Sequence, residues 1–297
     1  MQWESDVTAG EWITERLVDD QSLHRYVPQG FEAYARVLHP AFRERPIGAE
    51  WPPEGDPEAW ANFSHDIESE QARWAEAATA LGTHVDARSE WDAVAGARRD
   101  AEGWRYEDPN MGTLDPASLS ALATILMDHT STPDDGFASV WDGWGGLVGF
   151  VGSRPSRAGL AAAYSDAPAE NVRHRSMLRE SFRDIAFRRK GWNPGVLSDD
   201  ISRGPRLETL TRSHVLFRAA PRTWTDPLWP GTVPWREGGE AYSPSLAWPA
   251  DRAWILVTDP EAHSTVVGGS AQLIAALAED PSVEALRVDP TDPDWAL

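Results

Sequence analysis

The chain has 297 residues, of which 41% are hydrophobic and 16 are tryptophan, a composition far from that of chains that stay disordered. It contains no cysteine, which excludes disulfides, thiolate nucleophiles and cysteine metal sites. Its 27 basic and 47 acidic residues give a net charge of −20, which argues against a nucleic acid ligand and favours a basic protein partner.

Neither a membrane span nor a signal peptide is predicted. No run of 18 apolar residues occurs, and the first residues, MQWESDVTAGEW, are acidic where a signal peptide is basic and then apolar. We therefore expect a cytoplasmic protein without a membrane-embedded segment.

The first third of the chain is expected to contain a helix, a strand, a loop and a second helix. Residues 6–20 carry apolar side chains at helical intervals, and residues 30–40 are rich in the aromatic and branched side chains typical of a strand. The proline-rich residues 43–58 predict a surface loop. Residues 58–81 keep a roughly helical apolar spacing, which Gly82 would end.

The clearest helix start in the middle of the chain lies at Asp115 and Pro116. Asp is a favoured N-cap and Pro is favoured at the first helical position, so this pair predicts a helix that begins at Pro116. Residues 137–152 are expected to form two strands around a glycine-containing turn. Residues 153–205 have a basic middle between ends rich in Pro, Gly, Ser and Arg, and predict a variable basic insertion or a long loop.

Strand signals return in the last third. Residues 207–219 are expected to be extended, whereas residues 221–248, rich in proline and tryptophan, predict an ordered but irregular crossing. Residues 251–288 then predict a strand, a loop, a strand or turn, a helix and a final strand. We expect the helix to pack on the sheet through Leu273, Ile274 and Leu277.

Helices and strands mix along the chain without the strict alternation of a doubly wound fold. This order favours the α+β class, as one domain over residues 1–297 with a largely antiparallel mixed sheet, packed helices and a C-terminal strand-helix-strand unit.

Three phrases resemble an uncharacterised family of acidic, Trp-rich cytoplasmic proteins from GC-rich bacteria. They are YVPQGFEAYARVLHPA, DHTSTPDDGFASVWDGWGG and WPADRAWILVTDPEAHSTVVGGSAQLIAAL. The likeness covers most of the chain except roughly residues 153–205, and it implies no activity, cofactor or catalytic residue.

The phrase TVVGGSAQL places Gly268, Gly269 and Ser270 between an apolar run and a helix. A phosphate cradle has this outline, but the longer glycine loop and the lysine of a phosphate-binding motif are missing. We favour Ser270 as the N-cap of the helix and the two glycines as turn residues, with ligand contact as the alternative.

A site for a small ligand or for catalysis is the second hypothesis, placed near residues 258–270. Trp144, flanked by glycines, could stack on a ligand, although such a tryptophan more often packs against a sheet. Trp254 would lie nearby, and Asp259 and His263 are residue types of acid–base chemistry that an exposed polar turn also explains.

Positive charge gathers in the segment RHRSMLRESFRDIAFRRKG. Arg175, Arg179 and Arg183 would line one side of a helix there, and we expect them to contact either the acidic surface of the protein itself or an anionic partner.

No recognised catalytic, cofactor or metal-binding motif is found, and no cofactor or metal is predicted. The leading hypothesis is therefore a non-catalytic, cytoplasmic protein-binding protein, of the immunity or antitoxin kind, for a basic partner. Its aromatic residues are of the type favoured in binding hot spots.

Overall fold

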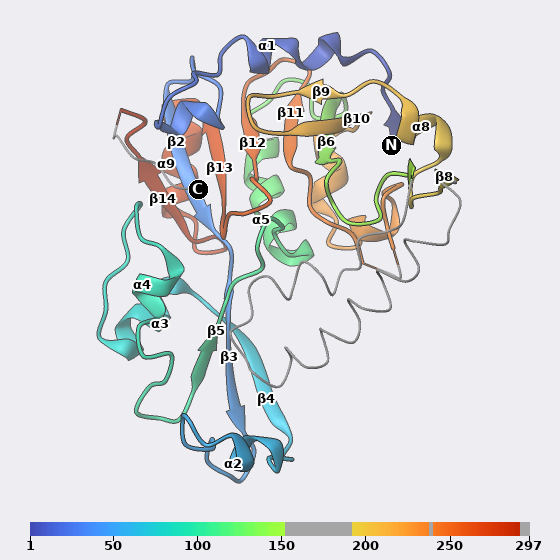
Figure 1. Ribbon diagram of the computed structural model, residues 1–297. Coiled ribbons are helices and arrows are strands. Elements are labelled where there is room, and N and C mark those ends of the chain that lie inside the picture. The colour runs from blue at the N-terminus through green and yellow to red at the C-terminus, as the bar shows by residue number, and fades with distance from the viewer. Residues whose placement is uncertain (152–191, 238–239, 292–297) are drawn as a thin grey trace.

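Nine strands of the described residues form one antiparallel sheet, which is the body of the protein (Figure 1). The computed structural model describes residues 1–151, 192–237 and 240–291. The sheet order is β1 (Gln2–Trp3), β10 (Ser213–Arg218), β6 (Gly136–Trp141), β11 (Leu246–Pro249), β12 (Ile255–Val257), β13 (Ser264–Gly269), β2 (Ala33–Leu38) and β14 (Ala285–Val288), with β9 (Leu207–Glu208) beside β10. Every described strand pair is antiparallel, as the α+β prediction expected.

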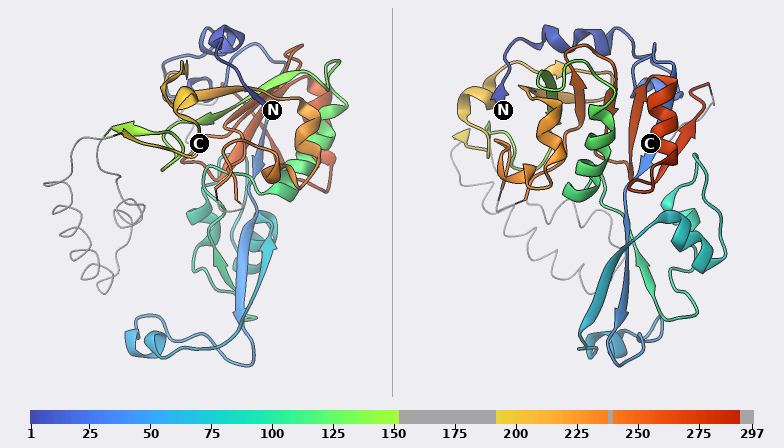
Figure 2. Two further views of the ribbon diagram at one scale, coloured as in Figure 1. Left: turned by 90° about the vertical axis from the view of Figure 1, so that its right-hand side faces the viewer. Right: turned by 180° about the vertical axis from the view of Figure 1, so that it is seen from behind.

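Both faces of this sheet are covered because alternate side chains of its central strands point to opposite sides. Leu256 and Val267 face a core formed with α5 (Pro116–Met127), α9 (Ala271–Glu279) and η4 (Pro221–Thr225). The two long helices lie side by side on that face (Figure 2). Ile255 and Val266 face the second core, which the N-terminal segment closes with η1 (Val7–Gly10), α1 (Glu11–Thr14) and η2 (Leu23–Arg25).

The C-terminal strand-helix-strand unit is confirmed. Strands β13 and β14 both pair antiparallel with β2 from its two sides, so they run parallel to each other with β2 between them. Helix α9 connects them, and Leu273, Ile274 and Leu277 are fully buried against the sheet. Strand β2 and the start of α5 at Pro116 also agree with the prediction.

The predicted helix over residues 6–20 is wrong in its length. The side chain of Asp6 caps η1 by accepting from the Thr8 amide, and α1 ends at Thr14. Two tight turns follow, because the amides of Arg16 and Leu17 bond three residues back, and Val18 then donates to the His24 carbonyl.

The prediction is also wrong between residues 41 and 72. Strand β3 (Ala41–Pro46) occupies the start of the expected loop. The residues expected to form one long helix form three elements instead: α2 (Pro57–Ala61), β4 (Ile67–Ala72) and α3 (Trp74–Leu81). Cross-strand ion pairs explain β4, since Arg43 contacts Glu70 and Arg45 contacts Glu68 at 3.0 Å.

These elements build an arm that projects from the body (Figures 1 and 2). Its sheet has the order β4-β3-β5, where β5 is Arg105–Glu107, and α3 packs with α4 (Trp91–Ala95) at its base. Trp74, Trp91 and Tyr106 form the centre of a separate small core there.

Polar contacts, most of them at least partly buried, fix the arm to the body. The Glu284 carboxylate, next to β14, accepts from the amides of Trp74 and Ala75, both at 2.8 Å. The Trp74 indole N–H donates to the His39 carbonyl at 2.8 Å. Arg36, 1% exposed, donates to the carbonyl oxygens of Ala87 and Ser89. The base of the arm is therefore anchored by several hydrogen bonds, of which that from Trp74 to His39 is buried.

The two strands predicted within residues 137–152 do not pair with each other. Strand β6 lies in the main sheet, whereas β7 (Phe150–Val151) pairs with β8 (Trp192–Asn193). Of the segment 153–205, the structure describes only residues 192–205, which contain β8 and α8 (Asp199–Arg203).

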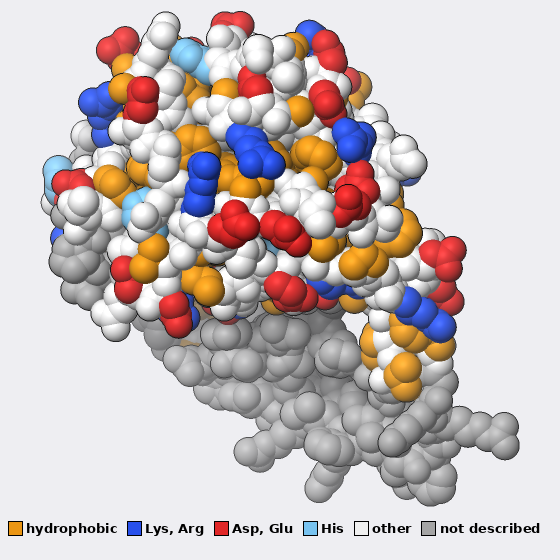
Figure 3. Space-filling model, turned by 90° about the horizontal axis from the view of Figure 1, so that it is seen from above, with side chains coloured by type: hydrophobic (Ala, Val, Ile, Leu, Met, Phe, Trp, Pro, Cys, Tyr) orange, Lys and Arg blue, Asp and Glu red, His pale blue; other side chains and the backbone are white. Residues whose placement is uncertain are grey.

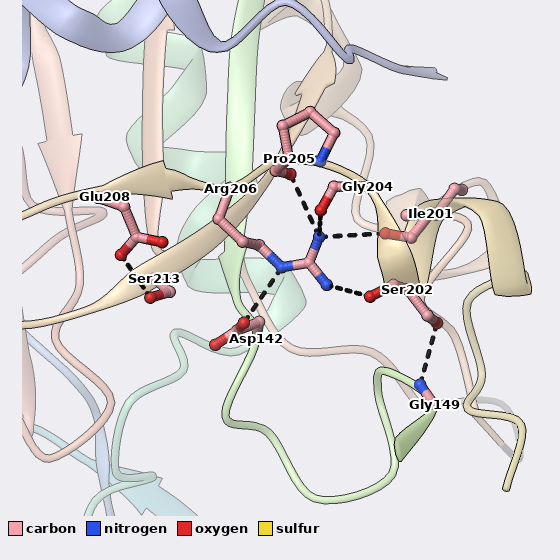
Figure 4. Close-up of polar contacts among 9 residues, drawn as sticks. All are labelled: Asp142, Gly149, Ile201, Ser202, Gly204, Pro205, Arg206, Glu208 and Ser213. Atoms are coloured by element: carbon pink, nitrogen blue, oxygen red, sulfur yellow. Dashed lines mark hydrogen bonds and ion pairs between the residues drawn. The ribbon is translucent and has the colours of Figure 1, made fainter. Parts of the chain in front are cut away.

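Arg206 ties α8 to the body (Figure 4). Its guanidinium bonds Asp142 at 3.1 Å and the carbonyl oxygens of Ser202 and Gly204, while the Ser202 hydroxyl accepts from the Gly149 amide at 3.0 Å. The chain following residue 191 is thus firmly attached to the end of β6.

None of the helices within the described ranges is long and apolar enough to span a membrane.

Candidate partner-binding surface

The far end of the arm carries a cluster of three aromatic side chains from residues 47–70, which we call the tip. Trp51 and Trp60 are stacked with ring centroids 5.8 Å apart, and Phe63 lies 5.6 Å from Trp51. All three rings are partly exposed. Helix α2 lies at this end, away from the body (Figure 1). An aromatic cluster that is half open to solvent has spare ring surface to offer a partner.

Local sequence features hold these rings in place. Asp56 caps α2 by accepting from the Ala59 amide, and Pro57 occupies the first helical turn. The Trp60 indole N–H donates to the Pro53 carbonyl at 3.2 Å, and that of Trp51 donates to the Gly103 carbonyl at 3.1 Å. Because both N–H groups are already bonded, the rings present apolar faces and edges.

Two arginines support the cluster from the side of β5. The Arg105 guanidinium lies 5.3 Å from the Trp51 ring centre and 5.5 Å from that of Trp60, and Arg99 lies 5.8 Å from Trp60. Each has an acidic neighbour, since Arg105 pairs with Glu107 and Arg99 approaches Glu54 at 3.7 Å. These cations therefore stiffen the tip without making it basic.

The tip itself is strongly acidic. Residues 47–70 contain seven Asp or Glu and no Lys or Arg, so their formal charge is 0 − 7 = −7. The seven are all exposed: Glu50, Glu54, Asp56, Glu58, Asp66, Glu68 and Glu70. Four of them, Glu50, Asp56, Glu58 and Asp66, form no ion pair with any described residue.

Exposed aliphatic side chains complete this surface. Ile47 is 60% exposed and Ile67 is 39% exposed, on opposite strands at the end of the β3–β4 hairpin. The face at the other end of the molecule differs, because acidic and basic side chains are interspersed there (Figure 3). The tip therefore combines apolar surface with an excess of negative charge.

The predicted tryptophans have structural partners. Trp144 stacks on Tyr242 at 3.8 Å with an interplanar angle of 5°. Trp254 is 2% exposed and donates its indole N–H to the Leu126 carbonyl, beneath α5. The Trp254 ring is therefore part of the core.

Gly268 and Gly269 are not turn residues. They are the last two residues of β13 and pair with Tyr34 and Ala33, so the turn prediction is wrong. A Cβ at Gly268 would come within 2.9 Å of the rings of Phe31 and Tyr34, which explains the need for glycine. Ser270 is the N-cap of α9, as predicted, and accepts from the Leu273 amide at 3.1 Å.

Asp259 and His263 contact different neighbours. Asp259 is 8% exposed and bonds Arg212, with both N–O distances at 3.2 Å. Burial lowers the pKa of His263, while the negative charges of Asp108, Glu90 and Asp92 oppose this shift. No described contact joins Trp144, Asp259 and His263 to one another.

Arg175, Arg179 and Arg183 lie outside the described residues, and their role in partner binding stays a prediction. Among the residues that the structure describes, no group of three or more His, Asp or Glu is placed to hold a metal ion.

The tip is not evident from the sequence because the helical spacing of Trp60 and Phe63 resembles a buried stripe. The available signal was the combination of four prolines, three aromatic residues and seven acids without a base over residues 46–70.

Comparisons of the chain with models of protein families, with curated proteins and with solved structures found no match.

Proposed function

We propose that this protein is a non-catalytic binding protein that holds a basic protein partner at the tip. The observation that carries the proposal is the stacked pair of Trp51 and Trp60 among seven exposed carboxylates with no basic residue in the same segment.

The chemistry of the tip defines the partner. Arginine and lysine side chains can lie against indole faces while their charges meet carboxylates, a contact worth roughly 0.5–2 kcal/mol per cation–aromatic pair. Ile47 and Ile67 add apolar contact for an aliphatic or aromatic residue of the same partner. The matching partner surface is therefore basic with apolar side chains interleaved.

Two physical properties favour binding at this place. The rings are already fixed by their hydrogen bonds and by Arg105, so little side-chain entropy is lost on association. The charge of −7 on residues 47–70, at the end of the projecting arm, attracts a basic protein over about 8–10 Å at physiological salt and speeds its approach.

The same charge repels nucleic acid. We place the binding of the protein partner in the cytoplasm. The tip suits an immunity or antitoxin protein that neutralises a basic toxin.

A pull-down from lysate of the native host at low and high salt tests the proposal. The wild-type chain is expected to retain a basic protein in stoichiometric amount at low salt and to lose it at high salt. The triple variant Glu50→Gln, Glu58→Gln, Asp66→Asn should not retain it.

The matched control neutralises Glu15, Asp200 and Glu279, which are exposed and lie on the body. It should retain the partner as the wild type does. Absence of any stoichiometric partner at low salt, or equal loss with both triple variants, would refute the proposal.

A further inference from the structure

A cavity of about 430 Å³ lies at the start of α5, on the body and apart from the tip. Its walls include Asp115 at the N-cap of α5, Leu147 after β6, and Trp235, Glu240 and Tyr242 from the segment before β11. The volume lies within the range of about 300–1,000 Å³ that is usual for small-molecule sites.

The described residues that line this cavity carry charge of one sign. Its described lining residues include three carboxylates, Asp115, Glu237 and Glu240, and no Lys or Arg. Glu237 and Glu240 exchange backbone hydrogen bonds at 2.9 and 3.1 Å. Directly paired residues of an antiparallel bridge carry their side chains on the same face, so these two side chains leave the backbone on one side.

Asp115 has a spare acceptor. Its Oδ1 caps α5 by accepting from the amides of Ala117 and Ser118, both at 3.1 Å. Its Oδ2 is buried and accepts no hydrogen bond from any described residue. Buried carboxylate oxygens are normally bonded, so this carboxylate keeps an acceptor that no described residue uses.

An aromatic wall stands beside these acids. Tyr242 is stacked on Trp144 at 3.8 Å, and Trp235 donates its indole N–H to the Tyr242 carbonyl at 2.9 Å. The Tyr242 ring is therefore held by its stack on Trp144, and the Tyr242 backbone by Trp235. Carboxylates next to aromatic rings are the surroundings in which ammonium and guanidinium groups bind in proteins.

We propose that this cavity binds a small organic cation, a primary amine or guanidine with an apolar part. The charged group lies among the carboxylates of Asp115, Glu237 and Glu240, and the apolar part lies against Tyr242 and Leu147. An anion would meet three carboxylates, and a neutral molecule would leave their charge without a counterion.

Calorimetric titration of the full-length chain with three probes of nearly equal shape tests this site. The probes are 2-phenylethylamine, the neutral 2-phenylethanol and the anionic 3-phenylpropanoate. The amine should bind in a saturable, one-to-one manner, the alcohol at least 10-fold more weakly, and the carboxylate not at all. No amine binding, or equal binding of amine and alcohol, would overturn the proposal.

Asp115→Asn isolates the charge, because Asn caps helices as well as Asp and keeps an acceptor for the Ala117 and Ser118 amides. It should weaken amine binding at least 10-fold. The same substitution at the N-cap of η1, Asp6→Asn, is the matched control and should leave the amine affinity unchanged. Unchanged affinity in Asp115→Asn would overturn the proposal.

Should Asp115→Asn fold poorly, the variant Glu237→Gln/Glu240→Gln decides, since it alters only exposed side chains. A several-fold loss of amine affinity supports the site, and an unchanged affinity overturns it. These measurements need no protein partner, so this inference and the proposed function can fail independently.

Discussion

Trp51 and Trp60 stack at an interplanar angle of 26° at the end of the arm, and the Arg105 guanidinium lies over both rings. The two tryptophans come from different parts of the tip, one from the proline-rich loop and one from α2. Their contact therefore fixes a loop that has no other core. It also leaves ring surface uncovered, which a purely structural aromatic pair would bury.

Replacing Trp60 by Ala should weaken binding of the basic partner by about 10–100-fold, because truncation of an interface tryptophan commonly costs about 1.4–2.8 kcal/mol. The midpoint of thermal unfolding should change by no more than about 2 °C, since the ring is outside the described cores. Surface plasmon resonance and calorimetry measure these two quantities.

Leu228→Ala is the control, because Leu228 is 75% exposed and lies on the body. It removes an exposed apolar side chain without touching the tip. Equal affinity losses for the two variants would show that the effect is not specific to the aromatic pair.

Glu284 should contribute measurably to the attachment of the arm. Glu284→Ala would leave the amides of Trp74 and Ala75 without their acceptor and should lower the free energy of unfolding by about 1–3 kcal/mol. Glu284→Gln keeps one acceptor and should lower the free energy of unfolding by a smaller amount. Urea unfolding measures both, and the interpretation fails if Glu284→Ala is as stable as the wild type.

Stability should fall on mild acidification. Burial lowers the pKa of His39 to about 4 and that of His214 to about 3, below the ordinary value of 6.5. The unfolded chain then binds more protons than the folded one below pH 6.5. The contribution of the neutral His39 is complete above pH 6.5 and is lost as the pH falls towards 4, at about 1.4 kcal/mol per pKa unit.

Urea unfolding of the wild type and of His39→Gln between pH 7.5 and 4.5 measures this effect. The variant should be less stable at pH 7.5, because His39 bonds the Asn110 carbonyl and the Thr265 hydroxyl, and the difference should shrink on acidification. His65→Gln, at an exposed position, is the control. A difference that stays constant with pH would contradict the role of His39.

Ser270 gives a direct test of the helix cap. Ser270→Ala should cost about 1 kcal/mol of stability, whereas Ser270→Asp should restore it, because Asp is also a good N-cap and its charge suits a helix N-terminus. Thermal unfolding of the two variants measures this difference in stability. If Ser270→Asp is no more stable than Ser270→Ala, capping is not what Ser270 contributes.

Segments with strong local signals could be predicted from the sequence. Asp115 with Pro116, and Ser270 before an apolar helix, fix helix starts through contacts within four residues. The buried alternation in β2 likewise needs only its own side chains. Such signals do not depend on the rest of the fold.

The arm could not be predicted in the same way. Strand β4 has the sequence IESEQA, with only one β-branched residue, and its pairing depends on Arg43 and Arg45, which are about 25 residues away in sequence. The cavity at Asp115 likewise joins segments that are distant in the chain, from residue 110 to residue 242. Neither could be inferred before the strand order was known.

The most direct test of partner binding at the tip is hydrogen–deuterium exchange of the chain with and without its basic partner. We predict slower exchange within residues 47–70 in the complex, above all in α2 and the loop that carries Trp51. Unchanged exchange throughout residues 47–70, with protection confined to the body, would contradict the account.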